Sequence, residues 1–179
     1  MAKLILFVWI FFPFGMVNAQ PITKHELHEL FFKSGTNPLL SGELYNKLRN
    51  CSIRTPLIRA YKGISEAMLA RNTTNIYKKY KLFLSGRDTL EQAIKEDIGN
   101  FEIRFLRFQF QSNIPSFLGY NTIPQDKRFL LENLISYLKT SEDKEFTIKM
   151  FSVLSGSKYF TTNELNLLKQ ISTSSSFRN

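Results

Sequence analysis

The chain has 179 residues, of which 24 are Lys or Arg and 15 are Asp or Glu, giving a formal net charge of +9 at pH 7. This length suits one domain with a single hydrophobic core. The one cysteine, Cys51, excludes an intrachain disulfide, so we expect packing alone to stabilise the fold and Cys51 to be buried as a small apolar residue.

Residues 1–19 have the pattern of an export signal. Lys3 provides a short positive segment, residues 4–14 are an apolar run, and Val17 and Ala19 are small residues at the positions that a signal peptidase reads. The run is too short to span a bilayer of roughly 30 Å as a helix. We therefore predict a signal peptide over residues 1–19 and an exported protein that starts near Gln20 with a net charge of +8.

A series of helices with short connections is predicted after the signal. Apolar residues at helical spacing indicate helices over 24–33, 41–50, 56–71, 75–97, 124–139, 141–154 and 162–171. Thr55 and Pro56 form a typical helix start, and Thr161 with Glu164 forms a capping box. Gly86 interrupts the helix 75–97 at a cost of roughly 1 kcal/mol relative to alanine, which indicates a close neighbouring helix or a bend.

The segment 101–111 fits two secondary structures. Phe101, Ile103 and Phe105 alternate as in a strand, yet at 100° per residue the apolar side chains of the segment form two stripes on a helix. A helix that is apolar on two faces can lie between two other helices. Since the flanking segments are helical and Asn100 can act as a cap, we predict a central helix.

The apolar connector 114–120 contains more large side chains than an ordinary surface loop. If it is buried, it fills space between helix layers, which we favour because Pro115 and Gly119 suit a tight path. If it is exposed, Phe117 and Tyr120 would form an apolar patch for a partner or a membrane. Residues 173–179 are polar without apolar periodicity and are predicted to be a disordered tail.

These elements predict an all-α fold in a single domain over residues 20–172. Short connections between helices imply antiparallel helix pairs, arranged as a compact bundle or as a short degenerate tetratricopeptide-like solenoid.

Two resemblances concern the middle of the chain. Leu90, Ala93 and Ile94, followed by residues 96–100, resemble the end of one tetratricopeptide repeat and the turn into the next, although Ile98 replaces the usual proline. Residues 93–94, 100–108 and 115–120 resemble small exported helical proteins of gram-negative bacteria that have no assigned function. The second resemblance implies a periplasmic or cell-envelope protein and no particular chemistry.

The sequence contains few residues in patterns that suit catalysis or metal binding. His25, His28 and Glu29 could share one helix face, but the spacing is not that of a zinc-binding HExxH motif, and we predict a solvated polar face without a metal. Carboxylate pairs for hydrolysis could come from Glu91 with 96–97, or from residues 142–145. We expect no cofactor and no enzyme activity.

Two basic residues are the first candidates for binding. Arg104 and Arg107 lie on the predicted central helix, where their guanidinium groups must reach solvent, pair with acids or line a groove that holds a carboxylate of a ligand. Phe117 and Tyr120 of the connector complete the set of candidate binding residues.

The leading hypothesis is therefore an exported helical scaffold or binding protein of the cell envelope, whose partner is an envelope protein, a peptide or a small ligand. The main alternative is a basic protein that associates peripherally with an anionic membrane, and a small carboxylate-dependent hydrolase is a third. Nucleic acid is not an expected partner, because the chain is predicted to be exported and has no known nucleic-acid motif.

Overall fold

The computed structural model describes residues 22–173, which fold as α-helices and short 3-10 turns with no β-strand in that range. The prediction of an all-α fold is thereby confirmed. The helices are α1 (Lys24–Thr36), α2 (Pro38–Asn50), α3 (Pro56–Met68), α4 (Ile76–Glu96), α5 (Phe101–Ser112), α6 (Ile123–Thr140), α7 (Lys144–Ser155) and α8 (Thr162–Thr173). The turns are η1 (Leu69–Asn72) and η2 (Ser116–Leu118). No helix within 22–173 is long and apolar enough to cross a membrane.

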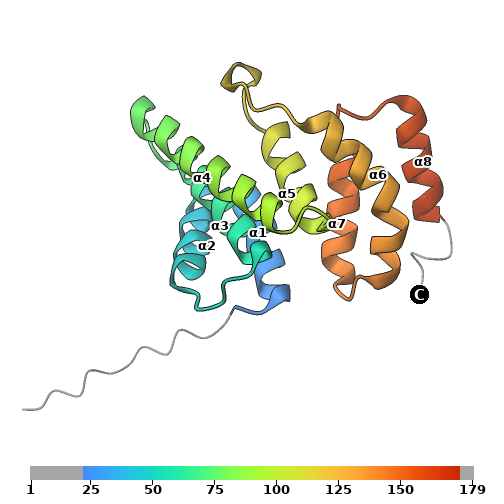
Figure 1. The fold of residues 1–179 in the computed structure, drawn as a ribbon, viewed down its shortest axis with the longest axis horizontal. Coiled ribbons are helices and arrows are strands. Elements are labelled where there is room, and N and C mark those ends of the chain that lie inside the picture. The colour runs from blue at the N-terminus through green and yellow to red at the C-terminus, as the bar shows by residue number, and fades with distance from the viewer. Residues whose placement is uncertain (1–21, 174–179) are drawn as a thin grey trace, which may run out of the picture.

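The helices form two groups with α5 between them, as Figure 1 shows. Helices α1 to α4 form one group, in which α3 packs on α2 and closely on α4, and α6 to α8 form the other. Helix α5 packs on α3 and α4 of the first group and on α6 of the second. One hydrophobic core runs through both groups, so residues 22–173 form a compact helical bundle.

Helix α5 is the central helix that its two apolar stripes predicted. Phe101, Phe105 and Phe108 of one stripe and Ile103, Leu106 and Phe110 of the other are all buried. The side chain of Asn100 caps the helix by accepting a hydrogen bond from the backbone N–H of Ile103 at 3.1 Å. The alternating pattern resulted from phenylalanine on both faces of a buried helix, which imitates a strand over a short window.

A glycine contact sets the spacing of α3 and α4. A Cβ atom added to Gly86 would lie 2.5 Å from the carbonyl oxygen of Gly63 and 2.7 Å from the Cβ of Ala67. A Cβ added to Gly63 would lie 2.7 Å from the carbonyl oxygen of Gly86. The two backbones therefore touch where neither helix has a side chain, and the predicted close approach at Gly86 is confirmed.

The predicted helix ends agree with the observed ones to within a few residues. Thr161 and Glu164 exchange the two backbone hydrogen bonds of the capping box, and Cys51 is buried as expected. Helix α2 begins earlier than predicted because Asn37 caps it and Pro38 supplies its first turn. Helix α8 continues to Thr173, the first residue of the predicted tail. The predicted signal peptide and the remaining tail lie outside the described residues.

Candidate functional site

The first candidate site contains Arg107, which lies buried between two carboxylates. Its Nε and Nη2 atoms donate to the two carboxylate oxygens of Asp126 on α6 at 2.7 Å each, and Nη1 donates to Glu91 on α4 at 3.0 Å. Asp126 is fully buried, and Arg104 donates to it as well, from Nη1 at 3.0 Å. The Nε of Arg104 donates to the carbonyl of Ile98. These contacts join α4, α5 and α6.

The carboxylates of Asp126 and Glu91 keep the guanidinium group of Arg107 protonated. Burial alone would lower the pKa of this guanidinium, but the hydrogen bonds and negative charges of Asp126 and Glu91 outweigh burial and raise its pKa above the ordinary value. Each donor-bearing nitrogen of the guanidinium is engaged by one of these carboxylates. The arrangement therefore stabilises the packing of three helices and leaves little capacity to hold a ligand carboxylate.

The connector between α5 and α6 is divided between the core and the solvent. Ile114, Leu118 and Tyr120 pack against the core, and the hydroxyl of Tyr120 donates to Glu91. Burial and the adjacent carboxylate raise the pKa of Tyr120, so its hydroxyl stays protonated. Phe117, in contrast, is 83% exposed. The connector is therefore buried in part, as predicted, and its Phe117 side chain is left in solvent.

The second candidate site contains His28, which is buried between two acids from other helices. Its Nε2 lies 2.6 Å from Glu102 on α5, and its Nδ1 lies 2.8 Å from Asp143, the N-cap of α7. Tyr61 on α3 donates to Glu102 at 2.7 Å, and Lys24 lies 3.5 Å from the other oxygen of Glu102. Ionised carboxylates only accept hydrogen bonds, so the imidazolium form of His28 satisfies both acids at once.

The surroundings of His28 keep both acids ionised. Burial would raise the pKa of Glu102, but the hydrogen bond and charge of His28, together with Tyr61 and Lys24, lower it below its usual value near 4.5. The pKa of Asp143 is lowered in the same way against the effect of burial, by the backbone N–H of Phe146 and by His28. Four helices, α1, α3, α5 and α7, meet at these ionised groups.

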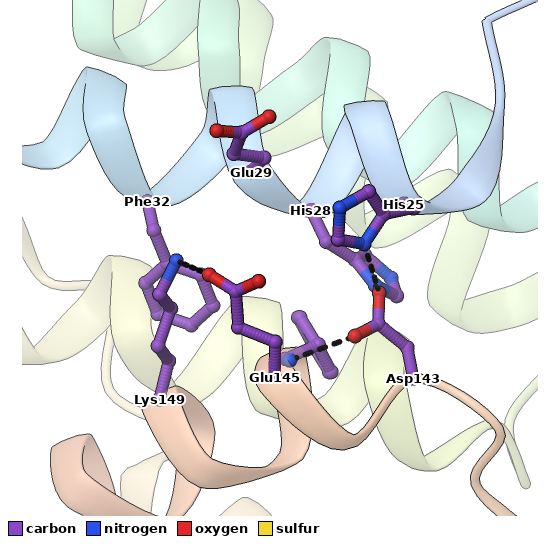
Figure 2. Close-up of a pocket in the computed structure, with 8 residues that line it drawn as sticks. His25, His28, Glu29, Phe32, Asp143, Glu145 and Lys149 are labelled. Atoms are coloured by element: carbon purple, nitrogen blue, oxygen red, sulfur yellow. Dashed lines mark hydrogen bonds and ion pairs between the residues drawn. The ribbon is translucent and has the colours of Figure 1, made fainter.

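A shallow depression lies beside His28 on the surface, between α1 and α7. Figure 2 shows His25 and Phe32 of α1 on the side that faces Glu145 and Lys149 of α7, with Asp143 below His25, and Glu29 also lines the depression. The depression contains no enclosed space for a water molecule. His25 lies 3.4 Å from Asp143, and Lys149 binds Glu145 at 2.5 Å. Within residues 22–173, no group of histidine, cysteine and acidic side chains is arranged to hold a metal ion.

Acid should lower the stability of the fold through His28, Glu102 and Asp143, which we call the His28 cluster. A carboxylate whose pKa is lowered on folding stabilises the fold above its unfolded pKa, and this stabilisation is lost as the pH falls through the folded pKa. We expect the urea midpoint, followed by circular dichroism, to fall between about pH 5 and about pH 3. The fall should be shallower in His28→Gln, because Glu102 and Asp143 then lose the partner that lowers their pKa values.

The matched control for this pH series is Glu29→Gln. Glu29 pairs with Lys33 on the exposed face of α1, where solvent screens the pair. This control should keep a slope close to that of the unaltered protein. Equal slopes in the unaltered protein and in His28→Gln would show that the cluster does not set the acid sensitivity.

The carboxylates proposed for hydrolysis are dispersed among separate partners. Glu91 binds Arg107, Glu96 binds Arg59, and Asp143 binds His28. Glu145 pairs with Lys149. The structure therefore does not bring the predicted carboxylate pairs together in a common cleft. The two acids that it does bring close to one group are Glu102 and Asp143, on opposite sides of His28.

A third candidate site is the N-terminal end of α4, which extends beyond the end of α3. Residues 74–81 are all exposed, and Phe83 is the first buried side chain of the helix. Ile76 is 83% exposed and Tyr77 is 66% exposed. We call residues 74–81 the α4 tip. It projects from the body of the molecule at the upper left of Figure 1.

Sequence reasoning missed the α4 tip because helical spacing predicts a helix over 75–97 but does not show which of its turns other helices cover. Two observations account for the exposure of the tip, the first from the helix lengths in the structure and the second from the sequence. Helix α4 spans 21 residues and its antiparallel partner α3 only 13, so at 1.5 Å per residue roughly two turns of α4 lack cover from α3. Between Glu66 and Asp88 the chain also has five basic residues and no acidic one.

Comparison with known proteins gives no family assignment: no protein-family model matches the chain, and neither a curated protein nor a solved structure is significantly similar to it. The two resemblances noted in the sequence stay predictions.

Proposed function

We propose that this chain is an exported helical binding protein of the cell envelope that acts through its surface and not through catalysis. The observation that carries this proposal is the α4 tip, where apolar and basic side chains are exposed together. Soluble proteins normally cover large apolar side chains that cluster, and a group of them left exposed marks a contact surface.

The buried charges support a structural role for the rest of the molecule. Arg107, Asp126 and Glu91 bind one another, as do His28, Glu102 and Asp143. Both clusters lie at junctions of three or more helices and fix the positions of those helices. A rigid body of this kind can hold the α4 tip and the connector in a constant arrangement for a partner.

Site-specific photocrosslinking in intact cells tests this proposal. A photoreactive residue at Tyr77 should give a discrete crosslinked product, because the α4 tip contacts the partner. The matched control is Ile148 on α7, which is 59% exposed and lies in the other group of helices. The same purified samples report export, since cleavage of the leader shortens the chain by residues 1–19.

Two results would contradict the proposal. If positions 77 and 148 give the same products, or if position 77 gives neither a protein adduct nor a lipid adduct, the α4 tip is not the contact surface. If the purified protein keeps residues 1–19 and stays in the cytoplasm, the cell-envelope assignment is wrong.

A further inference from the structure

The α4 tip has the composition of a segment that contacts a lipid surface. It carries Ile76, Tyr77 and Tyr80 with Lys78, Lys79 and Lys81, all of them exposed. Tyrosine suits the boundary between lipid and water because its ring is apolar and its hydroxyl is polar. Lysine can keep its ammonium group among lipid headgroups while its aliphatic stem lies along an apolar surface.

The helical spacing sorts these side chains onto distinct faces. At 100° per residue, Ile76, Tyr80 and Tyr77 occupy an arc of about 100°, with Lys79 beyond one edge and Lys81 beyond the other. The ammonium group of Lys81 lies 4.6 Å from the centre of the Tyr77 ring, so the basic and aromatic groups are in direct contact. The tip is thus a short amphipathic helix whose apolar face has basic borders.

A second segment with an exposed aromatic residue projects from the same edge of the molecule. In Figure 1, the connector between α5 and α6 projects from the upper edge, as does the α4 tip. Its Phe117 is 83% exposed and belongs to η2. A flat surface can contact both projections together, whereas a groove-shaped partner would have to fit two separate convex segments.

We propose that this edge docks on an anionic lipid bilayer, with Ile76, Tyr77, Tyr80 and Phe117 entering the interface. Lys79 and Lys81 contact headgroup phosphates, and Lys78 on the opposite face of the helix adds positive charge close to the surface. This inference rests on the proposed surface-binding function and names its partner. Charge complementarity favours an anionic surface, because the stretch between Glu66 and Asp88 has basic residues and no acidic residue that such a surface would repel. An acidic protein is the competing occupant.

Vesicle sedimentation tests the docking surface directly. The full chain should bind vesicles that contain phosphatidylglycerol and bind pure phosphatidylcholine vesicles much less, and salt should release it. The variant Lys78→Gln/Lys79→Gln/Lys81→Gln should bind the anionic vesicles about 100-fold more weakly, since each lysine near the surface contributes about one kcal/mol. The double variant Tyr77→Ser/Phe117→Ser should bind about tenfold more weakly.

The matched control removes the same charge from the other group of helices. The control replaces exposed lysines of α6, α7 and α8 in the variant Lys139→Gln/Lys144→Gln/Lys169→Gln. It should weaken binding by less than about threefold, because salt screens the attraction between the vesicle and charges that lie far from the docking edge. All variants keep the same N-terminal segment, so any binding by the leader cancels in the comparison.

The results separate failure of this inference from failure of the proposed function. Absence of binding to anionic vesicles, equal binding to neutral ones, or equal losses in the two triple variants would overturn lipid docking at this edge. If lipid docking fails but a photoreactive residue at Tyr77 still captures one protein in cells, the surface-binding function stands and the partner is an acidic protein. If both fail, the α4 tip is not a contact surface.

Discussion

Replacing Gly86 by leucine should destabilise the protein by more than about 3 kcal/mol, because no rotamer of the new side chain avoids the backbone of α3. Even the first added carbon would lie 2.5 Å from the carbonyl oxygen of Gly63. A backbone atom in the middle of a helix cannot move aside as a flexible side chain does, so α3 and α4 must separate. Thermal unfolding should then begin about 10 °C lower.

A helical glycine without close neighbours provides the control for Gly86→Leu. Gly35 lies in α1, and apart from its chain neighbours and the adjacent backbone of its own helix no described atom lies within 4 Å of an added Cβ. Gly35→Ala should leave stability unchanged or raise it by up to about 1 kcal/mol, because alanine favours helices. A loss of less than about 1 kcal/mol in Gly86→Leu would show that α3 and α4 can move apart freely.

Replacing Arg107 by methionine should cost about 3–5 kcal/mol, the usual penalty for removing one partner of a buried ion pair. Asp126 would stay fully buried with Arg104 as its remaining cation. Among the side chains of residues 22–173, Glu91 would keep only the hydroxyl of Tyr120 as a partner. Denaturant unfolding of the variant measures this loss. Arg107→Lys should recover little of it, since an ammonium group cannot donate in parallel to both oxygens of Asp126.

A surface ion pair gives the comparison for Arg107→Met. Arg59 pairs with Glu96 at a partly exposed position between α3 and α4, so Arg59→Met should cost less than about 1 kcal/mol. Removing both members of the buried pair in Arg107→Met/Asp126→Leu should restore part of the stability lost in the single variant. The structural role of the cluster is refuted if Arg107→Met and Arg59→Met cost the same.

Local patterns in the sequence were sufficient to predict the helices. The two apolar stripes of the segment 101–111, the cap at Asn100 and the capping box at Thr161 depend on residues within one or two turns, and the structure confirms each. Gly86 was informative for the same reason, because a glycine inside a long helix has a cost that a close helix contact compensates. Such signals require no knowledge of distant parts of the chain.

The pairing of buried charges could not be predicted in this way. Arg107 and Asp126 are 19 residues apart, and His28 and Asp143 are 115 apart. Periodicity shows that a side chain faces inward but does not show which acid it meets, because that depends on how the helices are packed. His28 was accordingly placed on a solvated face, whereas the structure buries it beneath the ring of Phe146, with the ring centres 3.8 Å apart.

The long sequence separation of the His28 contacts also bears on the order of folding. Helices α3 and α4 are joined by a short connection, so their pairing closes a small loop early. Helix α1 is made before every other helix of the described region, yet the acids that accept from His28 follow it by 74 and 115 residues. The imidazole of His28 therefore stays solvated until α5 and α7 have been synthesised. We expect its burial to be among the last steps of folding.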